Sequence, residues 1–179
     1  MPTRLATIDD IPALARVINR AYVVEAHLFH GDRTDEAEVC ERLERPNACF
    51  LVIDAPDGAR GDGALAGAVF VEVRGDRSYF GMLSVDPDWQ GRGLARELIS
   101  AAEAHATAAR CGFMDIDVVD RRTELPAFYT LFGYMATGSA PYASDAAKVP
   151  VRMIRMTKAL SPQPHRHPGQ GGNGCSGDH

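Results

Sequence analysis

Apolar positions recur along the chain with two different periods, and the difference separates predicted helices from predicted strands. Four apolar residues near the N-terminus lie at helical spacing: Ile11, Leu14, Ala15 and Ile18. Because Thr7 followed by Asp10 is typical of a helix start, we expect a helix over about residues 8–22. A second helix is expected from Thr34, after a loop in which the period is lost.

Strand-like runs follow at "ACFLVID" (48–54), "ALAGAVFVEVRG" (64–75) and "YFGMLSV" (79–85). The turn-rich segment "APDGARGDG" between the first two predicts a hairpin, and "GDRS" predicts the next turn. The glycines Gly61, Gly63 and Gly67 precede a strand, so they are interpreted as turn residues and not as a dinucleotide loop.

The second half of the chain is predicted to hold a helix over about 93–109 and a strand over 113–119. A short helix is expected at "PAFYTLF", with Pro126 in its first turn and Gly133 at its end, and two closing strands follow. This order of elements indicates an α+β fold, a sheet with helices on its faces.

Composition favours one globular domain over residues 1–160, since 45% of the chain is hydrophobic and 24% is charged. The remaining segment, 161–179, is rich in proline and glycine and has no large apolar side chain, so we expect a disordered tail. No basic leader and no run of about 18 apolar residues is present, so we expect no membrane association and a cytoplasmic protein.

The net charge of −5 and the absence of a basic stripe argue against a nucleic-acid partner and mildly favour an amine-bearing one. The four cysteines show neither C-x-x-C spacing nor a histidine pattern, so no metal site is expected.

The candidate chemistry begins at "SVDPDWQGRGLARELI", where a strand passes into a helix. Gly91 and Gly93 leave the backbone open to a ligand, and the helix start directs unpaired N–H groups to the same place. Arg92 and Arg96 add positive charge. The segment therefore predicts a phosphate cradle, with a merely compact connection as the alternative; it lacks the spacing of a P-loop or a dinucleotide-binding fingerprint.

The same residues resemble a known family. Gln90 to Ala95 look like the Q/R-x-x-G-x-G/A acetyl-CoA loop of the GNAT acetyltransferase superfamily, and "AFYTLFGYMATG" resembles its second signature. The resemblance extends from about Thr3 to Lys158. It implies an acetyl-CoA-dependent N-acetyltransferase on a three-layer fold, with a mixed, largely antiparallel sheet of six to seven strands and helices on both faces.

The resemblance also implies roles for particular residues. Pantetheine would lie along the strand at Leu83, Ser84 and Val85, and Tyr129 would protonate the leaving thiolate; a core aromatic is the alternative for Tyr129. The remaining residues implied to bind the cofactor are Gln90, Gly91, Arg92, Gly93, Leu94, Ala95 and Phe128. This chain has Arg122 and Leu125 where many family members have Asn and Ala, which puts an asparagine contact in doubt.

Direct transfer to an amine requires a base, because an ammonium group has no lone pair. Glu72, in a central strand, is the candidate base, with solvent exposure as the alternative, and the N–H of Val85 is the candidate donor to the thioester oxygen.

The resemblance also implies that the segment "YVVEAHLFHGDR" shapes the acceptor site, and Tyr22, Glu25, His30 and Asp32, with His27 nearby, are its polar or aromatic groups that could line it. The acceptor is expected to be an amine of a small molecule or peptide, and the protein a monomer or homodimer. Two alternatives remain open: an acyltransferase that uses another acyl group or an oxygen nucleophile, and a CoA-binding module without turnover.

Overall fold

The computed structural model describes residues 1–56 and 63–160 of the chain. The predicted tail, 161–179, and the middle of the predicted hairpin turn, which includes Gly61, lie outside the described residues.

Within this part of the chain seven strands form one sheet in the order β1-β2-β3-β4-β5-β7-β6. Neighbouring strands are antiparallel except β4 and β5, which are parallel. The strands are β1 (Thr3–Leu5), β2 (Ala48–Asp54), β3 (Leu65–Arg74), β4 (Arg77–Val85), β5 (Phe113–Val119), β6 (Met135–Pro141) and β7 (Arg152–Ala159). The predicted hairpin and the predicted order of elements are confirmed.

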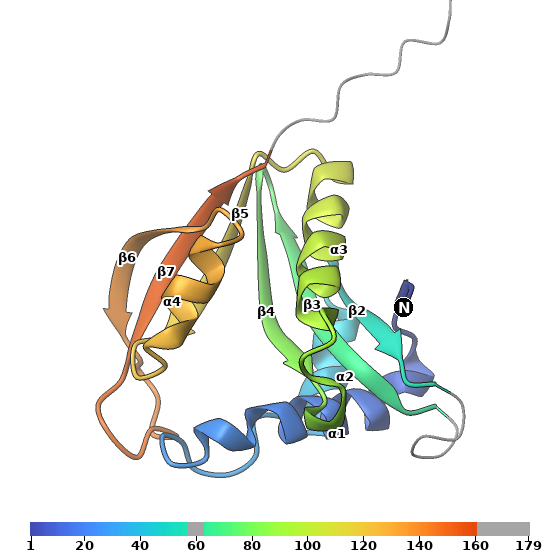
Figure 1. Ribbon diagram of the computed structural model, residues 1–179, viewed down its shortest axis with the longest axis horizontal. Coiled ribbons are helices and arrows are strands. Elements are labelled where there is room, and N and C mark those ends of the chain that lie inside the picture. The colour runs from blue at the N-terminus through green and yellow to red at the C-terminus, as the bar shows by residue number, and fades with distance from the viewer. Residues whose placement is uncertain (57–62, 161–179) are drawn as a thin grey trace, which may run out of the picture.

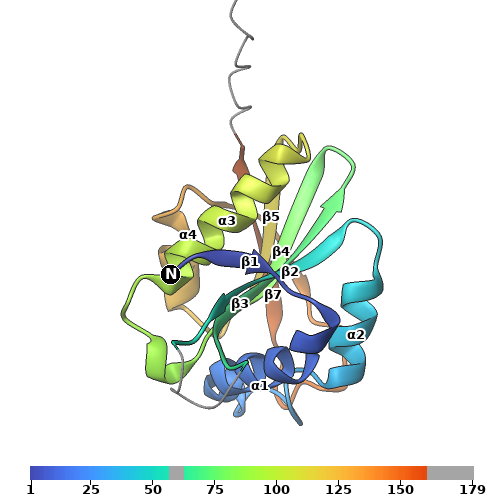
Figure 2. The same ribbon diagram turned by 90° about the vertical axis from the view of Figure 1, so that its right-hand side faces the viewer.

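Helices cover both faces of the sheet (Figures 1 and 2), as predicted. The α-helices are α1 (Ile11–Tyr22), α2 (Glu36–Glu44), α3 (Leu94–Ala108) and α4 (Glu124–Thr130), and the 3₁₀ turns are η1 (Ile8–Asp10), η2 (Val23–Glu25) and η3 (Pro87–Trp89). The largest buried cluster lies under α3 and α4, and a second lies under α1. A small third cluster is formed by Leu28, Val119 and Val151. Among the described helices, none is both long and apolar enough to cross a membrane.

Two helix starts differ from the prediction for local reasons. The N–H of Thr7 donates to Asp10 Oδ2 (2.7 Å), but the first turn, Ile8–Asp10, is 3₁₀ and the α-helix begins at Ile11. The second helix begins at Glu36, not Thr34, because the side-chain amide of Asn19 binds both the N–H and the C=O of Thr34.

The sheet opens between its two parallel strands. β4 and β5 are paired only where Arg77–Tyr79 faces Phe113–Asp115, and below this point they diverge (Figure 1). A bulge in β4 at Met82, whose φ is 51°, accompanies the opening, and the Ser84 hydroxyl donates to the Met82 carbonyl (2.9 Å). The gap between the two strands is where the candidate site lies.

Candidate active site

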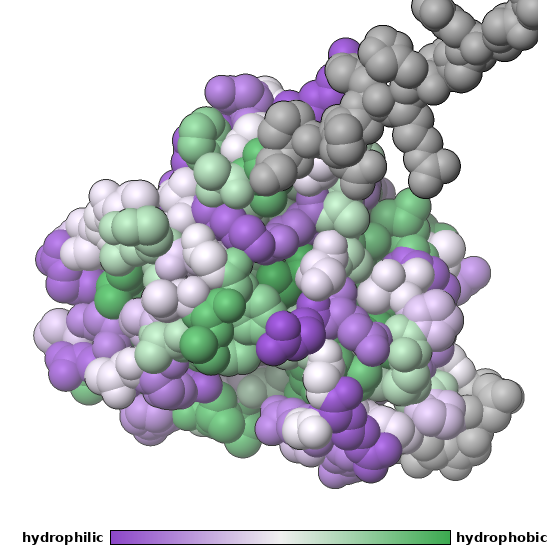
Figure 3. All heavy atoms as spheres, turned by 45° about the horizontal axis from the view of Figure 1, so that its top comes forward, coloured by the Kyte–Doolittle hydropathy of each residue, from purple (hydrophilic) through white to green (hydrophobic). Residues whose placement is uncertain are grey.

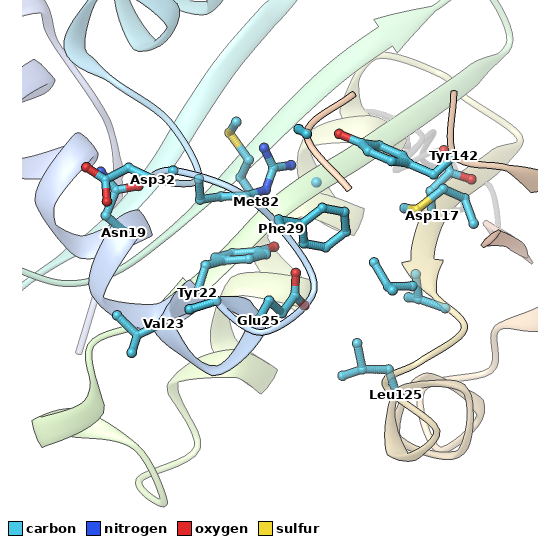
Figure 4. A pocket seen from close by; sticks show the side chains of 18 of the residues that line it. Asn19, Tyr22, Val23, Glu25, Phe29, Asp32, Met82, Asp117, Leu125 and Tyr142 are labelled. Atoms are coloured by element: carbon cyan, nitrogen blue, oxygen red, sulfur yellow. The ribbon is translucent and has the colours of Figure 1, made fainter. Parts of the chain in front are cut away.

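Two cavities meet at this gap. The larger, of about 680 Å³, runs between α3 and α4, and we call it the groove; apolar side chains gather in the hollow of this face among hydrophilic groups (Figure 3). The smaller, of about 230 Å³, lies between the α1–α2 segment and the ends of β5 and β7, and we call it the inner cavity (Figure 4). Four residues line both cavities: Tyr22, Glu25, Leu125 and Tyr129.

One end of the groove is built to receive an anion. Gly91 and Gly93 have φ values of 74° and 81°, which side chains disfavour, and both glycines line the groove. The first intrahelical bond of α3 runs from the Glu97 N–H to the Gly93 carbonyl (3.2 Å), so the N–H groups of residues 94–96 have no partner within the helix. Together with the positive end of the helix dipole, they form a site that suits a phosphate group.

Arginine side chains flank this helix start. Arg96 lines the groove with its guanidinium carbon 5.1 Å from the Phe132 ring centre. Arg92 stacks on Trp89 at 4.5 Å and is not among the groove-lining residues. These cations add to the attraction for an anion at the mouth of the groove.

The main chain of β4 forms the wall of the groove at Leu83 and Val85. The Asp86 N–H donates to the Ala66 carbonyl in β3 (2.9 Å). Along an antiparallel pair of strands, only every second residue directs its N–H and C=O toward the neighbouring strand. The N–H and C=O of Val85, the residue before Asp86, therefore point away from β3. The Val85 carbonyl indeed accepts from Gln90 Nε2 (3.2 Å). The N–H of Val85 therefore points toward the groove.

Tyr129 lies on α4 between the two cavities. Its ring is buried and packs against Phe80 and Tyr134, each at a centroid distance of 6.0 Å. Burial raises the pKa of the Tyr129 phenol well above its ordinary value of about 10, so the hydroxyl keeps its proton throughout the neutral pH range.

Glu25, at the end of η2, is the carboxylate that lies where the groove meets the inner cavity. Its side chain is only 9% exposed, and Oε1 accepts from Arg122 Nη1 at 3.1 Å. Burial raises the pKa of Glu25, while the charges of Arg122 and Arg33 oppose the rise. The charges of the two arginines favour the ionised form of this buried carboxylate, and its raised pKa makes it a stronger base than a solvated glutamate. Tyr22 and Glu25 point into the inner cavity side by side (Figure 4).

Most of the predicted site residues do line these cavities. The groove is lined by Leu83, Val85, Gln90, Gly91, Gly93, Leu94, Ala95 and Phe128, and the inner cavity by Tyr22, Glu25, His30 and Asp32.

Four predicted or nearby residues lie elsewhere. Glu72 is half-buried on β3, bound to Arg74, and lines neither cavity, because the sheet is still closed where it pairs with Tyr79. The geometry therefore does not support Glu72 as the base. Ser84 is buried beside the bulge and lines neither cavity, which argues against its contact with pantetheine. Arg92 and the exposed His27 line neither cavity either.

Sequence reasoning missed four residues of the site. Arg33, Tyr79 and Tyr142 line the inner cavity, and Arg122 lines the groove. Arg122 was noted only as a departure from the family pattern; its ion pair with Glu25 joins residues 97 positions apart, and no local spacing signals it.

The model of the acetyltransferase (GNAT) family matches residues 13–134. The chain belongs to this family. The predicted resemblance is thereby confirmed, and the protein is a GNAT acetyltransferase, an enzyme.

Solved structures share the fold of this GNAT acetyltransferase at low sequence identity. The ribosomal-protein-S18-alanine N-acetyltransferase of Escherichia coli has a TM-score of 0.72 and 16% identity, and the match covers 93% of this chain and 97% of that one. A phosphinothricin acetyltransferase from Sinorhizobium meliloti, in complex with acetyl-CoA, has a TM-score of 0.71, 15% identity, and coverages of 89% and 88%. The acetyltransferase yncA of Salmonella typhimurium, described as putative and solved with acetyl-CoA, has a TM-score of 0.67, 18% identity, and coverages of 94% and 97%. Because these three structures are only 15–18% identical to the chain, the likenesses establish the fold alone. No curated protein sequence matches the chain.

Proposed function

We propose that this GNAT acetyltransferase transfers the acetyl group of acetyl-CoA directly to an amine held in the inner cavity. The observation that carries the proposal is the shared wall of the two cavities. A donor in the groove and an acceptor in the inner cavity would meet beside Tyr22, Glu25, Leu125 and Tyr129.

The groove fits acetyl-CoA in shape and in polarity. The N–H groups at the start of α3, together with Arg96, suit the pyrophosphate, and the open main chain of Leu83 and Val85 suits the amides of pantetheine. Phe128 and Phe132 supply apolar contact with the pantetheine chain. When bound, acetyl-CoA supplies an activated thioester.

Each of three groups at the junction has a chemical role. Glu25 accepts a proton from the ammonium form of the acceptor, directly or through one water, and so frees the lone pair that attacks the carbonyl carbon. The Val85 N–H stabilises the negative charge that develops on the carbonyl oxygen. As the C–N bond forms and the C–S bond breaks, Tyr129 donates its proton to the leaving sulfur, and the second proton of the new C–N nitrogen restores the Tyr129 phenol. The products are an N-acetyl amide and the CoA thiol, and Glu25 releases its proton to solvent.

The described cysteines do not favour an acyl-enzyme route. Cys40, Cys49 and Cys111 line neither cavity, and burial raises the pKa of the Cys49 thiol to about 11, which suppresses the nucleophilic thiolate. Transfer within a ternary complex follows.

Thiol release tests the proposal. Purified protein, acetyl-CoA and a panel of amines are expected to release CoA thiol and yield an N-acetylated product by mass spectrometry. Protein incubated with acetyl-CoA alone should remain unacetylated. Tight binding of acetyl-CoA with no thiol release from any amine would support a binding module without turnover instead.

A further inference from the structure

The arrangement of charges in the inner cavity points to the class of the acceptor. We propose that it is a small amine that also carries a carboxylate, of the amino-acid class, with Arg33 binding the carboxylate while Glu25 receives the amine. This inference rests on the proposed function and narrows it.

Arg33 presents a cation to the inner cavity. Its guanidinium carbon lies 5.3 Å from the centre of the Tyr22 ring, and both residues line the cavity. The positive charge of Arg33 also acts to lower the pKa of Glu25, Tyr22 and Tyr79, which places it within electrostatic reach of three groups on the same wall. Over the described residues, Arg33 makes no ion pair and no side-chain hydrogen bond, so its donors are free for a ligand.

Two of the carboxylates that line the inner cavity are already neutralised. Asp117 is held by Arg155 through two hydrogen bonds, of 2.6 and 2.8 Å, and Glu25 is paired with Arg122. Asp32 lies beside Asn19 at the end of the cavity opposite Tyr142 and Asp117 (Figure 4).

Over the described residues, Arg33 and Asp32 are the charges of the lining that no ion pair neutralises, and of these two Arg33 is the one that shifts the pKa of Glu25. A ligand with an ammonium group alone would gain nothing from Arg33 and would be repelled by it. A ligand with an amine at Glu25 and a carboxylate at Arg33 complements both, since the guanidinium fork binds a carboxylate through two parallel hydrogen bonds.

A roof over the inner cavity limits the size of the acceptor. The segment after α1 and the β6–β7 loop lie side by side (Figure 1), where the His30 N–H donates to the Ala146 carbonyl (2.7 Å) and the Lys148 N–H to the Leu28 carbonyl (2.8 Å). The Phe29 and Tyr142 rings meet edge to face beneath this ladder, 5.3 Å apart.

The inner cavity is partly open to solvent and has a volume of only about 230 Å³. It suits an amino acid better than a polypeptide chain. Phe29, Tyr142, Leu125 and Met153 on its walls favour an uncharged side chain on the ligand.

A matched set of acceptors tests the inference. For several uncharged side chains, the amino acid, its carboxamide and the amine that lacks the carboxyl group are compared by thiol release with acetyl-CoA. The wild-type protein is expected to favour the acid over the other two by about 10- to 100-fold in kcat/KM, the usual effect of a charge-assisted hydrogen bond. Arg33→Met should abolish this preference. Because Arg33 also acts on the pKa of Glu25, the readout is the ratio of kcat/KM for the acid to kcat/KM for the carboxamide, since an effect through Glu25 lowers both values alike.

Arg16→Met is the control, since Arg16 is an exposed arginine of α1 that lines neither cavity, and it should keep the preference for the acid. Equal losses for acid and carboxamide in Arg33→Met would mean that Arg33 only supports the loop, and would overturn the inference. A preference for diamines over amino acids that is lost in Asp32→Asn would also overturn the inference. So would a preference for peptides. Either result would leave the proposed function intact. Absence of thiol release from every acceptor would overturn both.

Discussion

Tyr129 and Glu25 carry the proton transfers in this account, and burial acts on the pKa of each in the direction that its role requires. It raises the pKa of the Tyr129 phenol, which keeps the acid protonated, and that of the Glu25 carboxyl, which makes the base stronger.

Tyr129→Phe is expected to lower kcat on the order of 10²-fold, because the ring stays packed while the proton donor is lost. The KM for acetyl-CoA should change little. Steady-state thiol release measures both quantities.

Tyr134→Phe is the matched control, since it removes a phenol from the same aromatic cluster but lines neither cavity. Its hydroxyl donates to Glu103 (2.9 Å), so its loss should cost about 1 kcal/mol of unfolding free energy and leave kcat unchanged. Equal kcat values for Tyr129→Phe and the wild type would remove Tyr129 from the mechanism.

Glu25→Gln is expected to lower kcat/KM on the order of 10²-fold and to change its pH dependence. The base must be ionised, so wild-type activity falls as the pH is lowered through the pKa of Glu25. Burial places this fall above the pH of about 4.3 at which a solvated glutamate titrates. A pH profile of the variant that retains this fall would show that another group is the base.

The stability of the same variant separates a catalytic role from a structural one. A raised pKa in the folded state means that Glu25 contributes stability below its unfolded pKa and loses that contribution as the pH rises through the folded pKa. Glutamine is uncharged at every pH, and Arg122 keeps Glu124 as a partner. Thermal melting at pH 7 should therefore show no loss of stability.

At the scale of elements, the turn into α3 decides whether acetyl-CoA binds. Gly93→Ala would place a methyl group in the groove at a residue whose φ is 81°, with no protein atom within 4 Å of it. We expect the KM for acetyl-CoA to rise about tenfold from lost amide contacts and crowding of the ligand, along with about 1 kcal/mol of backbone strain.

Gly75→Ala is the control that separates backbone strain from loss of ligand contact. Gly75 has a φ of 70° and no protein atom within 4 Å of an added methyl group, but it lies in the β3–β4 turn and does not line the groove. This variant should lose similar stability with an unchanged KM. If both variants or neither raised the KM, the assignment of the loop would be incorrect.

The order of the elements could be predicted because period, turn residues and helix starts are local properties of the sequence. Thr7 with Asp10 and the segment "FMDIDVV" show this directly, since β5 covers the same seven residues as predicted. The opening of the sheet could not be predicted, because it depends on how far β4 pairs with a strand that begins almost thirty residues after β4 ends. The bulge at Met82 also contributes to the opening, and it could not be predicted because methionine is not a residue type that indicates a bulge.

At the scale of the whole molecule, the inner cavity is assembled from segments that lie far apart in the chain. Tyr22 and Arg33 flank the loop before α2, Tyr129 comes from α4, and Tyr142 follows β6. The family motifs marked the groove because its loop is continuous in sequence. The motifs did not indicate Arg33 or the Arg122–Glu25 pair. Glu72 was a candidate base from the sequence because the sequence does not show how far it lies from the opening of the sheet.

A crystal structure with CoA and an acceptor amine tests whether transfer occurs where the groove meets the inner cavity. We expect the pyrophosphate on residues 91–95, the thiol beside the Tyr129 hydroxyl, and the amine nitrogen within about 3.2 Å of the Glu25 carboxylate or one water away. A thiol that ends away from Tyr129, or an amine bound outside the inner cavity, would contradict it.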